Sequence, residues 1–202
     1  MAEAARRVLP ERRQRILDAA RFLVLRNGLK ATTMEAIARE ARIAKPTLYG
    51  YFPDKEAVFL GIVEELVEDL LAAFDAALKG EGDVVSRVAA ALVAKFATIE
   101  VLLQGSPHAA ELYDEHDRSA GPYFRAVEQT IEGAIAAELR AAGVEDAEAL
   151  TGVLAGAAYG IGRKTRDIAE IERSIRLLVE RLVRPELHDG PGSAANRQGK
   201  PA

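Results

Sequence analysis

The chain contains neither cysteine nor tryptophan among its 202 residues. The lack of cysteine excludes disulfides, thiolate metal sites and cysteine nucleophiles. Aromatic residues make up only 5% of the chain, whereas apolar residues reach 49%, which is enough for a sizeable core. A small aromatic share together with abundant alanine favours closely packed helices over a β-sandwich.

Long apolar runs are also absent. No stretch approaches the roughly 18 residues that a membrane-spanning helix needs. The first ten residues lack the apolar core of a signal peptide. The sequence holds no nucleophile elbow, phosphate-binding loop or paired metal motif, and its carboxylates are spread along helix surfaces. We therefore expect a cytoplasmic protein that is not an enzyme, needs no cofactor and has no membrane partner.

Charge is distributed unevenly along the chain. Residues 1–55 hold 12 Lys and Arg against 6 acids, a charge of +6. Since the whole chain carries −4, residues 56–202 carry −10. A basic module on an acidic body is what a domain that faces DNA phosphates needs. Arg6 and Arg7, before Pro10, belong to a predicted frayed arm and either reach DNA or are simply solvated.

Two short helices are predicted within residues 33–55. Thr33 is placed as an N-cap, and apolar residues then recur at helical spacing up to Ala41. A tight connection follows, and Pro46 suits the first turn of a second helix. Helix, short turn and helix at this spacing form a helix-turn-helix, whose second helix enters the major groove of DNA.

At these residues the chain resembles the TetR family of transcriptional regulators. The match runs from Ala44 through Lys-Pro-Thr-Leu-Tyr-Gly-Tyr-Phe-Pro-Asp to Lys55, with Thr32-Thr33 upstream. Gly50 departs from the pattern, in which a larger side chain is common, and is expected to end the short helix. By motif the resemblance covers about residues 11–60. The rest agrees only in length and helical character.

The resemblance implies which residues contact DNA. The motif positions that do so in the family correspond to Thr33, Lys45, Thr47, Tyr49, Tyr51 and Lys55. Base readout is expected at the start of the recognition helix, from Arg42, Ala44, Lys45, Pro46 and Thr47. Tyr49 has an alternative role as a packing residue. Leu48 and Phe52 are predicted to be core.

The predicted fold is all-α, with about nine helices. Three form an N-terminal helix-turn-helix domain over residues 11–55, and six form a ligand-binding and dimerisation domain over residues 56–185. Gly28 is the predicted stop of the first helix, and Asp54 the predicted cap of a long fourth helix. Further helices are expected at 83–103, 108–115, 121–142, 145–164 and 168–184. Residues 186–202, rich in Gly, Pro and Ser, are predicted to be a disordered tail.

Two further sites are candidates in the body. An effector pocket would be lined by Phe74, Phe96, His108, Tyr113, His116, Phe124 and Tyr159, although scattered aromatics also suit a plain core. His108 and His116 lie near acids, but their spacing of eight residues does not favour a metal site, so none is predicted. A dimer interface is expected at Gly152, Gly156, Ala157, Gly160, Ile175, Leu178 and Leu182.

The resemblance implies a homodimeric repressor. It would bind a palindromic double-stranded DNA operator and be released by a small apolar or amphipathic effector. The rival interpretation is an effector-free dimer that binds DNA constitutively or as an architectural protein. An enzyme fused to a helix-turn-helix is a third interpretation, with little in the sequence to favour it.

Overall fold

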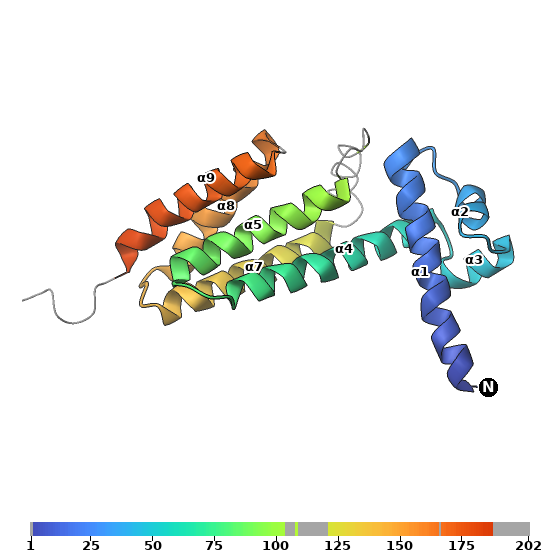
Figure 1. Ribbon diagram of the computed structural model, residues 1–202, viewed down its shortest axis with the longest axis horizontal. Helices are drawn as coiled ribbons and strands as arrows, with labels where there is room; N and C mark the ends of the chain where they lie inside the picture. The colour runs from blue at the N-terminus through green and yellow to red at the C-terminus, as the bar shows by residue number, and fades with distance from the viewer. Residues whose placement is uncertain (1, 104–107, 109–120, 166, 188–202) are drawn as a thin grey trace, which may run out of the picture. The chain divides into compact units, whose positions relative to one another are not determined.

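The computed structural model describes residues 2–103, 108, 121–165 and 167–187. Within these ranges every regular element is helical (Figure 1). The α-helices are α1 (Ala2–Asn27), α2 (Met34–Glu40), α3 (Lys45–Tyr51), α4 (Lys55–Leu78), α5 (Val84–Leu103), α7 (Gly121–Ala141), α8 (Ala147–Lys164) and α9 (Ile168–Val183), followed by a 3₁₀ turn, η1 (Arg184–Glu186). The all-α prediction is confirmed. The expected helix at 108–115 and the predicted tail from residue 188 onward lie outside the described residues.

One helix boundary differs from the prediction. The expected frayed arm of residues 1–10 is helical from Ala2, so α1 runs through Pro10. Alanine, arginine and glutamate dominate this segment, and all three favour the helix strongly. Their combined preference prevails over the single proline.

The chain divides into two compact units. Unit 1 comprises residues 1–71 and 98–127, and unit 2 comprises residues 72–97 and 128–202. The helices α4, α5 and α7 each contribute residues to both units. No helix of the described part is long and apolar enough to cross a membrane.

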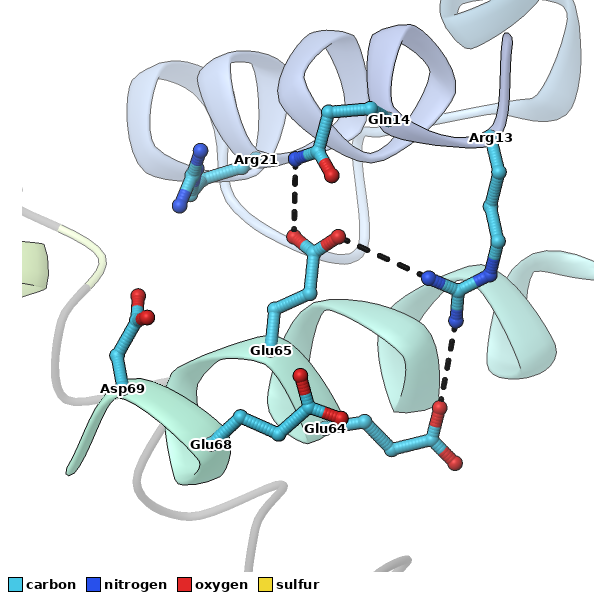
Figure 2. A pocket seen from close by; sticks show the side chains of 7 residues that line it. All are labelled: Arg13, Gln14, Arg21, Glu64, Glu65, Glu68 and Asp69. Atoms are coloured by element: carbon cyan, nitrogen blue, oxygen red, sulfur yellow. Dashed lines mark hydrogen bonds and ion pairs between the residues drawn. The ribbon is translucent and has the colours of Figure 1, made fainter. Parts of the chain in front are cut away.

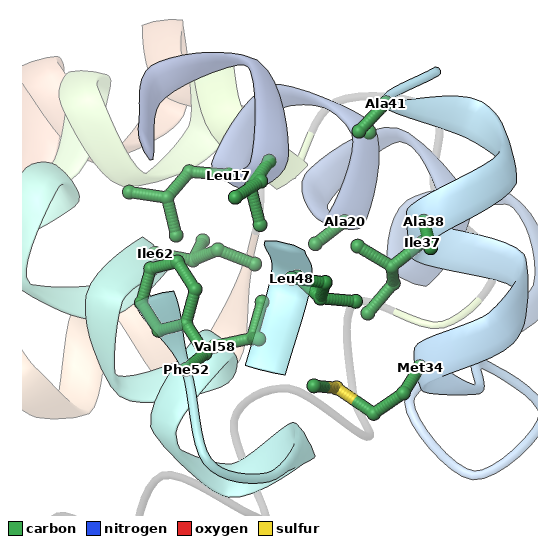
Figure 3. Packing of buried hydrophobic residues seen from close by; sticks show 12 residues of the cluster. Leu17, Ala20, Met34, Ile37, Ala38, Ala41, Leu48, Phe52, Val58 and Ile62 are labelled. Carbon is green, nitrogen blue, oxygen red and sulfur yellow. The ribbon is translucent and has the colours of Figure 1, made fainter. Parts of the chain in front are cut away.

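The core of unit 1 holds the first helices together (Figure 3). Leu17 from α1, Ile37 from α2 and Leu48 from α3 are each at most 1% exposed and meet in one cluster. Val58 and Ile62 from the start of α4 complete it. Fully burying a leucine stabilises a fold by about 1.5–3 kcal/mol, so the short α3 depends on Leu48 for its position.

The loop between α1 and α2 is fixed by local polar contacts. Gly28 ends α1 with a φ of +83°, a left-handed conformation that glycine adopts without steric cost, as the sequence predicted. The buried hydroxyl of Thr32 donates to the Gly28 carbonyl at 2.8 Å. The next residue, Thr33, stays exposed and caps α2. Adjacent threonines thus have separate roles, one inside the loop and one at the surface.

In unit 2, α8 and α9 lie side by side (Figure 1). The buried face of α9 is the row Ile171, Ile175, Val179 and Val183, at the four-residue spacing of a helical stripe. Leu154 and Ala158 of α8 are likewise buried. The opposite face of α8, which holds Gly152, Gly156 and Gly160, is exposed.

Candidate nucleic-acid interface

The helix-turn-helix is built from short-range hydrogen bonds. The Thr33 hydroxyl oxygen accepts from the Ala36 amide at 3.2 Å, so the predicted N-cap is confirmed. After α2 the chain reverses through Arg42, and the Ile43 amide donates to the Ala38 carbonyl at 3.0 Å. Ile43 packs against the core of unit 1. These contacts fix where α3 begins.

Arg42 occupies a strained position in this turn. Its φ is +54°, the one left-handed non-glycine residue in the described part of the chain. That conformation costs a side-chain-bearing residue roughly 1–2 kcal/mol relative to the right-handed region. The Arg42 side chain is nevertheless exposed at the surface beside the start of α3. A glycine would serve the turn at lower cost, so the guanidinium is a candidate for contact with a ligand outside the fold.

The recognition helix α3 has one buried and one exposed face. Leu48 is fully buried and Phe52, just after the helix, is 6% exposed, which confirms both as core. On the other side, Ala44, Lys45 and Pro46 are exposed and Tyr49 is 44% exposed. The predicted base-reading positions around the start of α3 are therefore accessible, with Thr47 half-buried.

Lys45 is tied to the preceding helix. Its ammonium forms an ion pair with the Glu35 carboxylate in the first turn of α2, and it lies 5.8 Å from the centre of the Tyr49 ring. The hydrogen bond between Lys45 and Glu35 raises the pKa of Lys45 and lowers the pKa of Glu35. Sequence reasoning singled out Lys45 and Tyr49 but not Glu35, because ten residues of chain and a turn separate the two charges.

Lys55 sits at the first turn of α4. Asp54 caps this helix, its carboxylate accepting from the Ala57 amide at 2.7 Å, which confirms the predicted cap. The Lys55 ammonium is half-buried and donates to the Leu29 carbonyl at 3.1 Å. An ammonium carries three donors, so this contact positions the group and leaves donors for an anion at the helix N-terminus.

Tyr51 is placed differently from the prediction. Its ring packs against the core of unit 1, and its hydroxyl is buried with no hydrogen-bond partner among the residues that the structure describes. A buried hydroxyl does not reach DNA, so in this conformation Tyr51 supports α3 from behind. The two-residue step from Tyr49 to Tyr51 turns the second ring inward. Gly50, expected to end α3, instead lies within it, exposed and with open space around its α-carbon.

A polar cavity of about 390 Å³ lies in unit 1 between α1 and α4 (Figure 2). Arg13 pairs with Glu64 at 3.4 Å and with Glu65 at 3.7 Å, and Gln14 donates to Glu65 at 3.4 Å. Burial raises the pKa of Glu65, although Gln14 and Arg13 partly offset this effect. The remaining lining side chains are Arg21, Glu68 and Asp69. The sequence suggested only a solvated acidic face here, because which helix covers it is a tertiary property.

The predicted effector residues fall in different places. Phe74 and Phe96 are buried in unit 2, and the Phe96 ring lies so close to Gly162 that a β-carbon there would overlap it. Tyr159 is 58% exposed and so lines no enclosed pocket, contrary to the prediction. His108 and Phe124 are half-buried in unit 1, and Tyr113 and His116 lie outside the described residues. In the described residues, no group of three metal-ligating side chains converges.

The outer face of α8 is open. Among the described residues, nothing lies within 4 Å of where a β-carbon would stand on Gly152, Gly156 or Gly160. Val153 beside them is 56% exposed, and Leu177 on α9 is 59% exposed. Among the predicted interface residues, Ala157, Leu178 and Leu182 are partly exposed. Ile175 is fully buried within its own chain, so it belongs to the core and its assignment to an interface is wrong.

Comparison with known proteins relates the helix-turn-helix region to a protein family. The family model described as bacterial regulatory proteins, tetR family, matches residues 16–62. The HTH-type transcriptional activator FasR of Mycolicibacterium smegmatis is 35% identical over 95 residues, 47% of this chain and 43% of FasR. The HTH-type transcriptional repressor KstR of the same organism is 41% identical over 71 residues, 35% of each chain. The chain therefore spans less than half the length of these curated relatives.

Structural similarity covers more of the chain than sequence similarity does. A solved TetR-family transcriptional regulator from Streptomyces coelicolor superimposes with a TM-score of 0.68 at 21% identity. The superposition covers 93% of this chain and 95% of that one. At this identity the likeness shows a shared all-helical fold with an N-terminal helix-turn-helix.

Proposed function

Because residues 16–62 place the chain in the TetR family of bacterial regulatory proteins, we propose that it is a transcriptional regulator that binds a palindromic DNA operator as a homodimer. The observation that carries the proposal is the exposed face of α3. Lys45, Pro46 and Tyr49 are accessible there while Leu48 anchors the helix from behind. The family assignment also supports a role other than catalysis.

Direct contact with DNA is supported by the chemistry of this surface. Arg42 and Lys45 offer donors to the acceptor groups of bases in the major groove. Thr33 and Lys55 sit at helix N-termini, where hydroxyl, ammonium and amide donors suit phosphate oxygens. The +6 charge of residues 1–55 supplies the long-range attraction.

The proposed dimer interface is the outer face of α8 with the adjoining side of α9. An open row of three glycines, flanked by the exposed Val153 and Leu177, allows close approach of a second copy. A two-fold dimer presents two recognition helices to two half-sites, which is why such regulators read palindromes.

We further propose that the protein is a repressor released by a small apolar or amphipathic effector, acting in the cytoplasm. The match to the repressor KstR supports the first part, whereas FasR is named an activator. The helix α4 begins at Lys55 in unit 1 and its residues from 72 onward belong to unit 2. A ligand that shifts α4 would therefore move a phosphate-contacting residue. The rival is an effector-free dimer that binds DNA constitutively.

Selection of bound duplexes from a random pool tests the DNA-binding proposal. A palindrome should be enriched, and its affinity should fall steeply with salt. Lys55→Met, which keeps the aliphatic stem, should weaken binding to all sequences and reduce the salt slope by about 0.9. Lys79→Met removes the same charge from an exposed position at the end of α4 and is the control. Enrichment of no sequence, or a slope that Lys55→Met leaves unchanged, would contradict the proposal.

A further inference from the structure

We propose that Glu35 is a specificity-determining residue, which holds Lys45 in an ion pair across the helix-turn-helix and thereby weakens binding to non-operator DNA. This inference rests on the proposed function, and it assigns a role to an acid on a surface built to meet a polyanion. Neither the motif nor the charge count of the sequence points to Glu35.

The geometry places two side chains, one from α2 and one from α3, beside the ammonium group of Lys45. Glu35 reaches it from the first turn of α2, whereas Lys45 begins α3. The ring of Tyr49, one turn further along α3, lies 5.8 Å from the nitrogen. Both charged side chains are more than half exposed, at 61% for Glu35 and 52% for Lys45. The pair therefore stands on the accessible side of the recognition helix.

Glu35 differs from the other acids of the basic module. Asp18 pairs with Arg21 on the same helix, and Asp54 caps α4. Glu40, at the end of α2, is exposed and has no ion pair among the described residues. Glu35 instead reaches from α2 to a residue predicted to read bases.

An unpaired lysine binds any phosphate. Such a contact releases a counterion and strengthens binding at every sequence alike. A phosphate is an anion, so the Glu35 carboxylate beside the Lys45 ammonium repels it and weakens that contact. A guanine edge offers neutral acceptors, to which the Lys45 ammonium can donate with one of its three donors while another stays on Glu35. The pair thus opposes the non-specific contact more than the specific one.

The substitution Glu35→Gln tests whether the phosphate contact and the base contact of Lys45 respond differently to the loss of the carboxylate. We expect affinity for an unrelated duplex of equal length to rise about two- to fivefold, with a salt slope steeper by about 0.9. Affinity for the selected operator should change less, so the ratio of operator to non-operator affinity should fall. Both affinities are measured by fluorescence anisotropy over a salt series. Circular dichroism confirms that the variant retains its helices.

Glu40→Gln is the matched control, because it removes the same charge from the same helix at its other end. If both substitutions changed the affinity ratio equally, the change in net charge would explain the result and the inference would be overturned. A second control places Glu35→Gln in a Lys45→Gln background, where it should no longer change the affinity ratio. An unchanged ratio in Glu35→Gln, for a wild-type chain that enriches a palindrome, overturns this inference alone. A wild-type chain that enriches no sequence overturns the proposed function with it.

Discussion

Arg42 carries backbone strain at the turn that leads into the recognition helix. We expect Arg42→Gly to stabilise the protein by about 0.5–1 kcal/mol, because glycine relieves the left-handed strain but loses more chain entropy on folding. The same change should weaken operator binding, since it removes an exposed guanidinium. Urea unfolding and operator titration measure the two effects. A loss of stability would mean that the side chain itself holds the turn.

Tyr51 offers a second test at the level of a single atom. Its hydroxyl is buried without a partner, and a buried unsatisfied polar group costs about 1–3 kcal/mol. Tyr51→Phe should therefore raise the unfolding free energy by about 1 kcal/mol and leave DNA affinity unchanged. Tyr49→Phe, at an exposed ring, is the comparison and should not stabilise. Weaker operator binding by Tyr51→Phe would return this residue to the DNA-contacting set.

Helix caps could be predicted from the sequence, whereas side-chain contacts between helices could not. Thr33, Gly28 and Asp54 were placed correctly because caps and helix stops depend on residues three or four positions away. The inward turn of Tyr51 and the pairing of Lys45 with Glu35 depend on how two helices meet. No local sequence pattern determines how two helices pack. The motif therefore identified the residues but not the directions in which their side chains point.

At the scale of the helix, Asp83 shows how one side chain fixes both a start and an end. Its carboxylate accepts from the Ser86 amide at 2.9 Å at the start of α5, and Arg184, after α9, donates to it at 2.6 Å. The Ser86 hydrogen bonds, followed by Arg184, hold the pKa of Asp83 well below its ordinary value. A depressed pKa means that the ionised group stabilises the folded state.

We expect Asp83→Ala to lower stability by about 1 kcal/mol, the typical cost of losing a cap. Asp83→Asn should lose less, since asparagine also caps helices. The stabilising effect of the charge is complete above the unfolded pKa of about 3.9 and is lost as pH falls through the lower folded value. From pH 7 to pH 2 the melting temperatures of the wild type and Asp83→Asn should therefore draw closer as the pH falls below about 3.9, without meeting, because the folded pKa lies below this window. Parallel curves would show that the charge is irrelevant.

The helix boundaries show the same contrast between local and tertiary information. The starts of α2, α3 and α4 were predicted closely, because Thr33, Pro46 and Asp54 mark them. The glycine row of α8 was visible in the sequence, but only the structure shows that none of the described residues covers its face. Tyr159 was grouped with the pocket by its aromatic ring, although it lies on that uncovered face.

At the scale of the whole molecule, the open face of α8 predicts a test of assembly. Gly156→Ala should stabilise the helix of a single chain by roughly 1 kcal/mol, because alanine has the higher helix propensity and its methyl group would meet none of the described residues. In a dimer that packs on this row, the added methyl should weaken association, and Leu178→Arg should give monomers by sedimentation. Gly133→Ala, in similarly open space on α7, is the control. A dimer that persists in both variants would place the interface elsewhere.

Effector response is also a property of the whole molecule. If an apolar ligand weakens operator binding, the operator must weaken ligand binding by the same factor, because the coupling is reciprocal. Coupling of this kind typically amounts to about 1–3 kcal/mol. A fluorescent apolar ligand titrated with and without operator should therefore show a several-fold difference in affinity. Equal affinities, for a ligand shown to bind, would favour the effector-free rival.

The contact between Arg184 and Asp83 also bears on the order in which parts of the chain fold during synthesis. It joins residues 101 positions apart, and unit 2 combines residues 72–97 with a segment that begins only at residue 128. The helix-turn-helix core spans only Ile16 to Ile62, so it is complete in sequence while most of the chain is still untranslated. Domains fold as units in the order of their synthesis. The nascent chain is therefore expected to fold its helix-turn-helix before the surface proposed for dimerisation has been synthesised. At that stage it can contact only one half-site of the proposed operator.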